Sequence, residues 1–212
     1  QIFLLVVVAL LVGAVVVQLN PTGNERISAY IPGLRDPLSA HYHVRRALEA
    51  FSNGGWLGVG IGKSETKLTG LPVPPTDSIY AVVGEETGVL GAGMLLALYT
   101  VILWRGLVIA RRAPDGLGTL MASGLTLWIV WEAYINMAVM VNLLPFAGNA
   151  LPLISAGGSN LLVTLASIGI LMNISRLSIQ TQEEDGKFFN AVVDLRRRYG
   201  RRRVSRDERA KK

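Results

Sequence analysis

Acidic residues lie in or beside apolar segments of this 212-residue sequence, where a charged group is expensive. Asp77 directly precedes a long apolar run, and Glu85 and Glu86 lie inside that run. Glu132 lies in the next run, with Asn136 four residues later. Ionisable groups in such positions mark functional sites by default. Their chemistry would be proton transfer or hydrogen bonding at a boundary between water and membrane.

Asp77 has two interpretations. Pro74 and Pro75 prevent a helix from extending backwards, so Thr76 or Asp77 can cap the helix that begins here. A carboxylate at that end also meets the positive end of the helix dipole. The pattern favours capping and catalysis about equally, and the two are compatible because a cap carboxylate faces the outer water.

The other polar residues of the apolar runs are predicted to form hydrogen bonds between helices. A proton relay through Glu132 is the alternative, but the pattern offers that acid no basic partner. The segment 144–160 is largely apolar yet interrupted by prolines and glycines, which is typical of a re-entrant loop buried against protein. The predicted polar network comprises Glu85, Glu86, Glu132, Asn136, Ser155 and Ser159.

Composition indicates an all-α, polytopic membrane protein. Half of the residues are hydrophobic, 17% are charged and the mean hydropathy is +0.40. Four stretches approach the roughly 20 residues that span a bilayer, at about 2–17, 79–103, 117–141 and 158–175. The sequence begins at Gln1, already inside an apolar run and without a signal peptide, so we expect a segment of a larger protein.

The charge distribution predicts the topology. Residues 176–212 contain 12 basic and 6 acidic residues, which accounts for the whole net charge of +6. A basic tail after a span indicates the cytoplasmic side and contact with anionic lipid, rather than nucleic acid. The basic connection after the second span, with Arg105, Arg111 and Arg112, then also lies inside. Residues 18–78 form a large extracytoplasmic loop.

The sequence of that loop predicts structure within it. Apolar residues recur with helical spacing over residues 42–51, and a glycine-rich stretch follows at 53–62. The stretch lacks the spacing of a phosphate-binding P-loop. His41 and His43 are the only histidines and have no third ligand nearby in the sequence, so no metal site is predicted. The need for a divalent cation stays open.

The order of these features resembles the C-terminal half of the SEDS family (FtsW, RodA and SpoVE). The likeness covers residues 18–176, and seven short stretches carry it in the family's order. They are Asp36-Pro37 with Tyr42-His43-Val44, the glycine-rich 54–62, Leu71-Pro72 with Thr76-Asp77, the Gly-Glu-Glu-Thr-Gly of 84–88, Asn136 with Leu144-Pro145, the Leu-Pro-Leu-Ile-Ser of 151–155, and the Gly-Gly-Ser of 157–159.

The resemblance implies the last four spans of a ten-span glycosyltransferase in the bacterial plasma membrane. It implies polymerisation of lipid II into peptidoglycan strands, in division or elongation, beside a class B penicillin-binding transpeptidase. Asp77 takes the place of the family's essential acid, a general base on the acceptor hydroxyl. The substrate-binding residues implied are Arg45, Arg46, Lys63, Lys67 and Thr76. Around Asp77, Val73, Pro75 and Ser78 replace the usual Glu, His and Phe.

Two other functions are consistent with the pattern. One is a flippase or transporter of lipid-linked precursors that uses Glu85, Glu86 and Glu132 as a polar path. The glycine-rich, broken elements lie on the outer side instead of the midplane, which disfavours it. The other is a non-catalytic scaffold of the cell-wall synthesis complex. For the glycosyltransferase, we expect the present segment to be inactive by itself.

Overall fold

The computed structural model describes residues 4, 7–8, 12–13, 20–66 and 76–181. All regular structure within those residues is helical, which agrees with the predicted class. The chain divides into two compact units, Gln1–Trp104 with Leu127–Ala166 and Arg105–Thr126 with Ser167–Lys212. Most of the predicted first span, the predicted tail beyond residue 181, and Lys67 lie outside the described residues.

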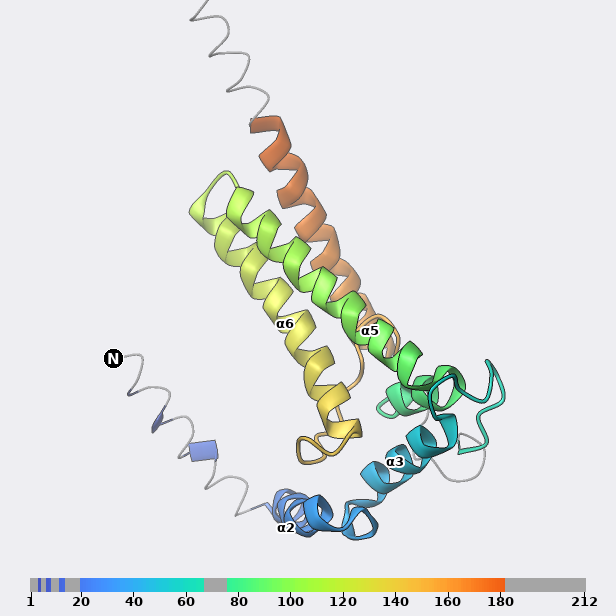
Figure 1. The fold of residues 1–212 in the computed structure, drawn as a ribbon. Coiled ribbons are helices and arrows are strands. Elements are labelled where there is room, and N and C mark those ends of the chain that lie inside the picture. The colour runs from blue at the N-terminus through green and yellow to red at the C-terminus, as the bar shows by residue number, and fades with distance from the viewer. Residues whose placement is uncertain (1–3, 5–6, 9–11, 14–19, 67–75, 182–212) are drawn as a thin grey trace, which may run out of the picture. The chain divides into compact units, whose positions relative to one another are not determined.

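Three long helices correspond to the last three predicted spans (Figure 1). They are α5 (Ile79–Arg112), α6 (Gly116–Met140) and a helix at Gly158–Thr181. Of these, α5 and Gly158–Thr181 are long and apolar enough to cross a membrane. The full set of four spans stays a prediction.

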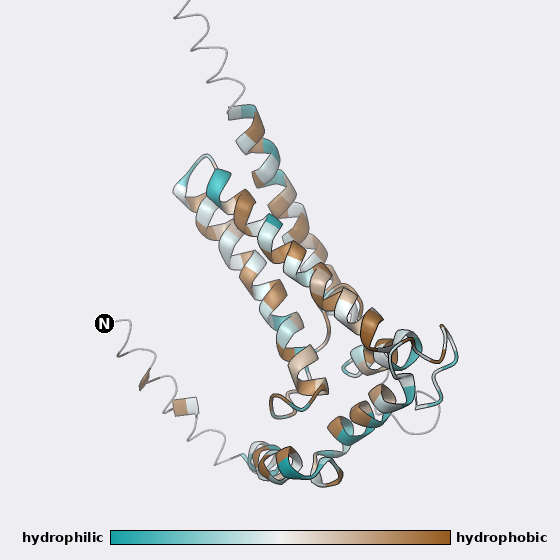
Figure 2. Ribbon diagram, viewed as in Figure 1, coloured by the Kyte–Doolittle hydropathy of each residue, from teal (hydrophilic) through white to brown (hydrophobic). Residues whose placement is uncertain are grey.

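The long helices expose apolar side chains instead of hiding them. Figure 2 shows hydrophobic residues along much of α5 and α6, and hydrophilic residues at the turn that joins them. Along α5 the exposed side chains include Leu90, Met94, Leu98 and Trp104. Exposed apolar surface on this scale marks an interaction surface, and on helices of this length and composition lipid is the expected neighbour.

Helix α5 is broken at Gly88, whereas the sequence pattern predicted an unbroken span. Gly88 has φ 71° and ψ −172°, a backbone conformation reached almost only by glycine. The glycine-rich loop fills the break, because the Val89 N–H donates to the Gly55 carbonyl (2.9 Å) and the Glu85 carbonyl accepts from the Val59 N–H (3.0 Å). The predicted span 79–103 therefore does not continue as one straight helix across Gly88.

Ordered helices occupy much of the segment predicted as a large outer loop. These are α2 (Pro21–Arg35), the 3₁₀ turn η1 (Pro37–Ser39) and α3 (Tyr42–Gly54). Helix α3 was predicted from its periodicity, and it buries Val44, Ala47 and Ala50 against the core. Helix α2 was not predicted. Two hydrogen bonds to the loop after α6 hold it, from Tyr30 Oη to the Leu143 carbonyl (2.7 Å) and from Asn142 Nδ2 to the Gly33 carbonyl (2.9 Å).

The second unit contains the end of α5 and the start of α6. Ala110, Ala122, Leu171 and Ile174 form its buried apolar cluster. Asp115 caps α6, since its Oδ1 accepts from the Gly118 N–H at 2.9 Å and its carbonyl accepts from the Thr119 N–H at 3.1 Å.

Candidate functional site

Asp77 lies in a turn formed by Thr76, Asp77 and Ser78, directly before α5. The Ser78 carbonyl accepts the first helical hydrogen bonds, from the N–H groups of Ala81 (3.0 Å) and Val82 (3.3 Å). Ser78 therefore holds the cap position, and the prediction that Thr76 or Asp77 caps the helix is wrong. No hydrogen bond to the half-buried Asp77 carboxylate is seen from residues 20–66 or 76–181.

The backbone on both sides of Asp77 is held by side chains from distant segments. Ser155 Oγ donates to the Thr76 carbonyl at 2.6 Å, and Asn136 Nδ2 donates to the Asp77 carbonyl at 2.9 Å. Asn136 is buried on α6, while Ser155 is buried in the loop that follows α6. These bonds restrain the backbone and leave the Asp77 carboxylate able to bind another molecule.

The Asn136 side chain belongs to a wider polar network. It also donates to the Asn149 carbonyl (2.6 Å), and Asn149 Nδ2 donates to the Glu132 carbonyl (2.9 Å). Asn160 Nδ2 donates to Glu132 Oε1 at 2.7 Å. Buried acceptor atoms of Glu132, Asn136 and Asn149 have no partner within the described part of the chain. The network therefore has spare acceptor capacity beside Asp77.

A stack of three rings lies next to Asp77. The Phe146 ring centroid lies 4.8 Å from that of His41 and 4.3 Å from that of His43, and the two imidazole centroids lie 5.4 Å apart, so each ring contacts the other two. The Arg26 guanidinium lies 5.2 Å from the Phe146 centroid, in a cation–π contact. A Cβ at Gly148 would lie 3.5 Å from Asp77 Oδ2, so the loop after α6 passes directly beside this carboxylate.

The two histidines of the ring stack have lowered pKa values. Burial lowers the pKa of both histidines below 6.5, and for His43 the neighbouring His41 lowers it further. Arg26 also lowers both pKa values, whereas the Asp77 carboxylate opposes this at His43 and Glu25 opposes it at His41. Near neutral pH both imidazoles are therefore largely uncharged neighbours of the acid.

Glu85 forms a separate buried centre. Its carboxylate accepts from the hydroxyls of Ser64 and Thr66, from the Thr66 N–H (3.4 Å) and from Asn53 Nδ2 (3.5 Å). It therefore fastens residues 64–66 to the first part of α5. The Glu86 carbonyl accepts from the Gly60 N–H at 3.0 Å and so also holds the glycine-rich loop.

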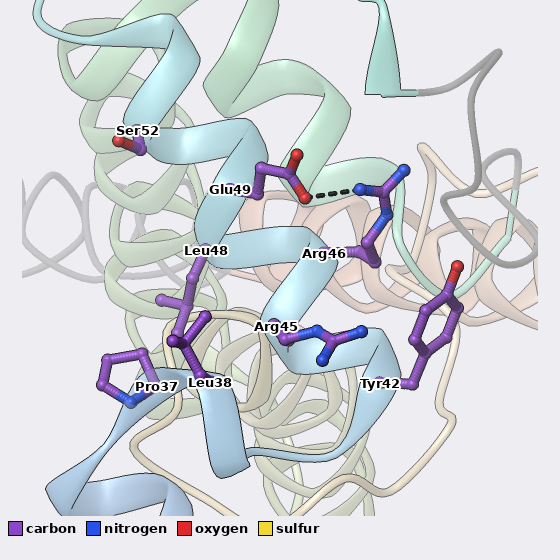
Figure 3. Close-up of a pocket in the computed structure, with 8 residues that line it drawn as sticks. All are labelled: Pro37, Leu38, Tyr42, Arg45, Arg46, Leu48, Glu49 and Ser52. Carbon is purple, nitrogen blue, oxygen red and sulfur yellow. Dashed lines mark hydrogen bonds and ion pairs between the residues drawn. The ribbon is translucent and has the colours of Figure 1, made fainter.

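An open groove of about 870 Å³ lies along α3 and η1 (Figure 3). Arg46 pairs with Glu49 there at 2.5 Å, while the Arg45 guanidinium lies 5.5 Å from the Tyr42 ring centroid. Asp77 does not line this groove, whose lining comprises Pro37, Leu38, Tyr42, Arg45, Arg46, Leu48, Glu49 and Ser52. Lys63 is exposed in the loop beyond α3.

Comparison with known proteins identifies the family. The model of the FtsW/RodA/SpoVE family, described as cell cycle proteins, matches residues 1–180. The chain belongs to the FtsW/RodA/SpoVE family. This membership confirms the resemblance predicted from the ordered motifs.

Relatives and a solved structure agree with the family match. The chain is 40% identical over 158 residues to stage V sporulation protein E of Bacillus subtilis, covering 74% of this chain and 43% of that protein. It is 41% identical over 174 residues to a probable peptidoglycan glycosyltransferase FtsW of Marinobacter nauticus, covering 81% and 43%. The chain thus spans less than half the length of these relatives.

A chain of the solved structure reported as "Structural coordination of polymerization and crosslinking by a peptidoglycan synthase complex" matches with a TM-score of 0.60. The two are 28% identical, and the match covers 84% of this chain and 49% of that one. The fold of this FtsW/RodA/SpoVE segment is therefore shared with a component of such a complex.

The predicted site residues separate into three places in this family member. Asp77, Thr76, Glu132, Asn136 and Ser155 come together, whereas Glu85 lies in its own centre and the arginines line the α3 groove. Glu86 contributes through its carbonyl, and Ser159 is exposed at the start of the last helix.

Sequence reasoning missed the partners that surround the acid. Arg26, His41, His43 and Phe146 form the ring stack, and Asn149 bridges the polar network. The histidines were weighed only as a metal pair, and no group of three or more metal-binding side chains is found in the described residues. His43 does stand within the family stretch Tyr42-His43-Val44, and that was the available signal.

Proposed function

We propose that the protein to which this chain belongs is a membrane glycosyltransferase that polymerises lipid II into peptidoglycan strands, with Asp77 as general base. The observation that carries the proposal is the restrained Asp77 turn. Ser155 and Asn136 bond the carbonyls on either side of the acid, and its carboxylate lies at the start of a helix able to cross a membrane. The family relationship supports the same activity.

In the proposed reaction an Asp77 oxygen takes the proton of the acceptor sugar's hydroxyl. The hydroxyl oxygen forms a bond to the anomeric carbon of the donor strand. The bond from that carbon to the lipid diphosphate breaks, and the diphosphate leaves with the electron pair. A carboxylate at the membrane boundary suits this chemistry because the sugars are in water while the polyprenyl chains stay in lipid.

Arg45 is our candidate for a phosphate contact to the lipid-linked substrate away from the reacting carbon, because Asp77 does not line the groove beside Arg45. Arg46 pairs with Glu49. Within the described residues, the contact seen for the Arg45 guanidinium is with the Tyr42 ring. The groove beside it contains exposed apolar side chains such as Leu38. A guanidinium next to an apolar wall offers both a bidentate contact for phosphate and a surface for the lipid tail.

The membrane arrangement is part of the proposal. We place the chain in the bacterial inner membrane as the last four of ten spans, with residues 18–78 outside and the basic tail inside. A class B penicillin-binding transpeptidase would be its partner, and lipid II its substrate. Glu85 and the network of Glu132 would act structurally.

The test is lipid II polymerisation by the full-length protein, purified with its transpeptidase partner. Asp77→Asn should reduce the rate by about 10²- to 10⁴-fold, the usual contribution of a general base. Asp36→Asn is the matched control, because Asp36 caps η1 through Oδ1 and asparagine keeps that acceptor. Polymerisation by Asp77→Asn at the unmodified rate would overturn the assignment.

A further inference from the structure

A small basic pocket lies between two helices within the unit formed by residues 105–126 and 167–212. The C-terminal parts of α5 and of the helix Gly158–Thr181 lie side by side there (Figure 1). Its volume is about 180 Å³, far more than a single water molecule needs. It is lined by Arg105, Val108, Ile109, Arg112, Ser175, Ser178 and Ile179.

The polar lining of this pocket suits an anion. Arg105 and Arg112 lie seven residues apart on one face of α5, and no acidic side chain is among the lining residues. No ion pair of either arginine is seen within residues 20–66 and 76–181. Guanidinium groups bind phosphate oxygens in a bidentate manner.

The two serines of the pocket, Ser175 and Ser178, have different hydrogen-bonding roles. Ser178 Oγ donates to the Ser175 carbonyl at 2.9 Å, so its proton is already committed. The Ser175 hydroxyl is left as the neutral donor beside the two guanidinium groups. The apolar members, Val108, Ile109 and Ile179, make the rest of the wall suitable for a group that is not entirely polar.

The pocket begins where the apolar runs end. Arg105 follows the predicted span 79–103 by two residues, and Ser175 is the last residue of the predicted span 158–175. Both helices are able to cross a membrane. The pocket therefore falls at the level of the lipid headgroups, on the side that carries the basic residues.

We propose that this pocket binds the phosphodiester headgroup of an anionic membrane lipid. Basic pockets between membrane helices on the cytoplasmic side are suited to such headgroups. The C-terminal end of α5 carries the negative end of its helix dipole, which opposes an anion. Binding must therefore depend on both guanidinium groups. This inference is independent of the role of Asp77.

The experiment uses the full-length protein in mixed micelles that contain phosphatidylglycerol and a neutral lipid, with bound lipid counted by native mass spectrometry. The test variant is R105Q/R112Q. The control is R111Q/R176Q, which removes the same number of charges, one from each of the two helices that line the pocket, at exposed positions outside the pocket. Circular dichroism and size-exclusion profiles establish that both variants are folded. R105K/R112K keeps the charge but loses the fork geometry.

We expect R105Q/R112Q to retain about 25-fold less phosphatidylglycerol, which corresponds to about fivefold for each cation near an anionic headgroup. R111Q/R176Q should match the unmodified protein, and R105K/R112K should lie between them. Equal losses in both double glutamine variants would overturn the proposal, because only general attraction to basic residues would remain. Displacement of the lipid by inorganic phosphate at equal concentration would assign the pocket to free phosphate instead.

Discussion

Replacing Asn136 by leucine should slow polymerisation without touching Asp77 itself. Asn136 is fully buried, and its Nδ2 donates to the carbonyls of Asp77 (2.9 Å) and Asn149 (2.6 Å). Leucine has a similar size and no donor. Asn136→Leu therefore removes one of the two side-chain bonds that restrain the Thr76–Asp77 backbone and leaves the bond from Ser155 in place.

The magnitude follows from the two carbonyls that lose their partner. A buried group left without a hydrogen bond costs about 1 to 3 kcal/mol. Asn136 Oδ1 has no partner in the described structure, so removing that oxygen offsets part of the cost. We expect a net loss of about 2 to 4 kcal/mol in the free energy of unfolding. A displacement of the acid by about 1 Å would reduce turnover by about 10²-fold.

The assay is lipid II polymerisation together with thermal unfolding, both on the full-length protein. Asn142→Gly serves as the matched control. Asn142 Nδ2 also bonds a carbonyl, that of Gly33 (2.9 Å), and its φ of 61° suits glycine. This control should lower the melting temperature and leave the turnover of the folded protein close to the unmodified rate.

A double-mutant cycle decides whether Asn136 acts through Asp77. In the Asp77→Asn background, Asn136→Leu should cause no further loss of activity, because the group that it positions is already gone. An additional loss of about 10²-fold in that background, or unmodified turnover by a folded Asn136→Leu protein, would refute the positioning role.

Two further predictions concern the break in α5 and the ring stack. Gly88→Ala should cost about 1 to 3 kcal/mol in unfolding free energy, because the φ of 71° excludes alanine and its Cβ would overlap the Trp56 backbone. Gly93→Ala, at an open position in the same helix, should be neutral or stabilising by denaturation. Since burial lowers the pKa of His41 and His43 in the folded state, stability present above pH 6.5 is lost as the pH falls below it. The melting temperature should therefore fall on acidification, and should fall less in the His41→Gln/His43→Gln variant.

Local properties made the helices predictable. The span predicted at 117–141 agrees with α6 at Gly116–Met140 within one residue at each end, and the helix predicted at 42–51 is the start of α3. Apolar length and periodicity are properties of neighbouring residues, so the sequence reveals them directly. Helix α5 passes the predicted end at 103 because helix-breaking signals come only after Arg112, at Pro114.

Long-range contacts explain what the pattern did not reveal. Helix α2 has weak periodicity and contains Pro32, and the bonds that hold it come from residues more than 100 positions away. Gly88 looks like another small residue of a packing stripe. Its role depends on the loop carbonyl of Gly55, which supplies the hydrogen bond that the broken helix loses.

The sequence by itself determined the membrane character, the family and the acid to examine first. Apolar runs and ordered motifs can be recognised directly in the sequence. Asp77 stands out because it follows two prolines and precedes an apolar run. The tertiary structure alone decided what surrounds that acid. Asn136, Ser155 and the stack of His41, Phe146 and His43 reach it from segments far apart in sequence. Spacing along the chain describes local geometry, whereas the surroundings of the Asp77 carboxylate depend on packing between distant elements.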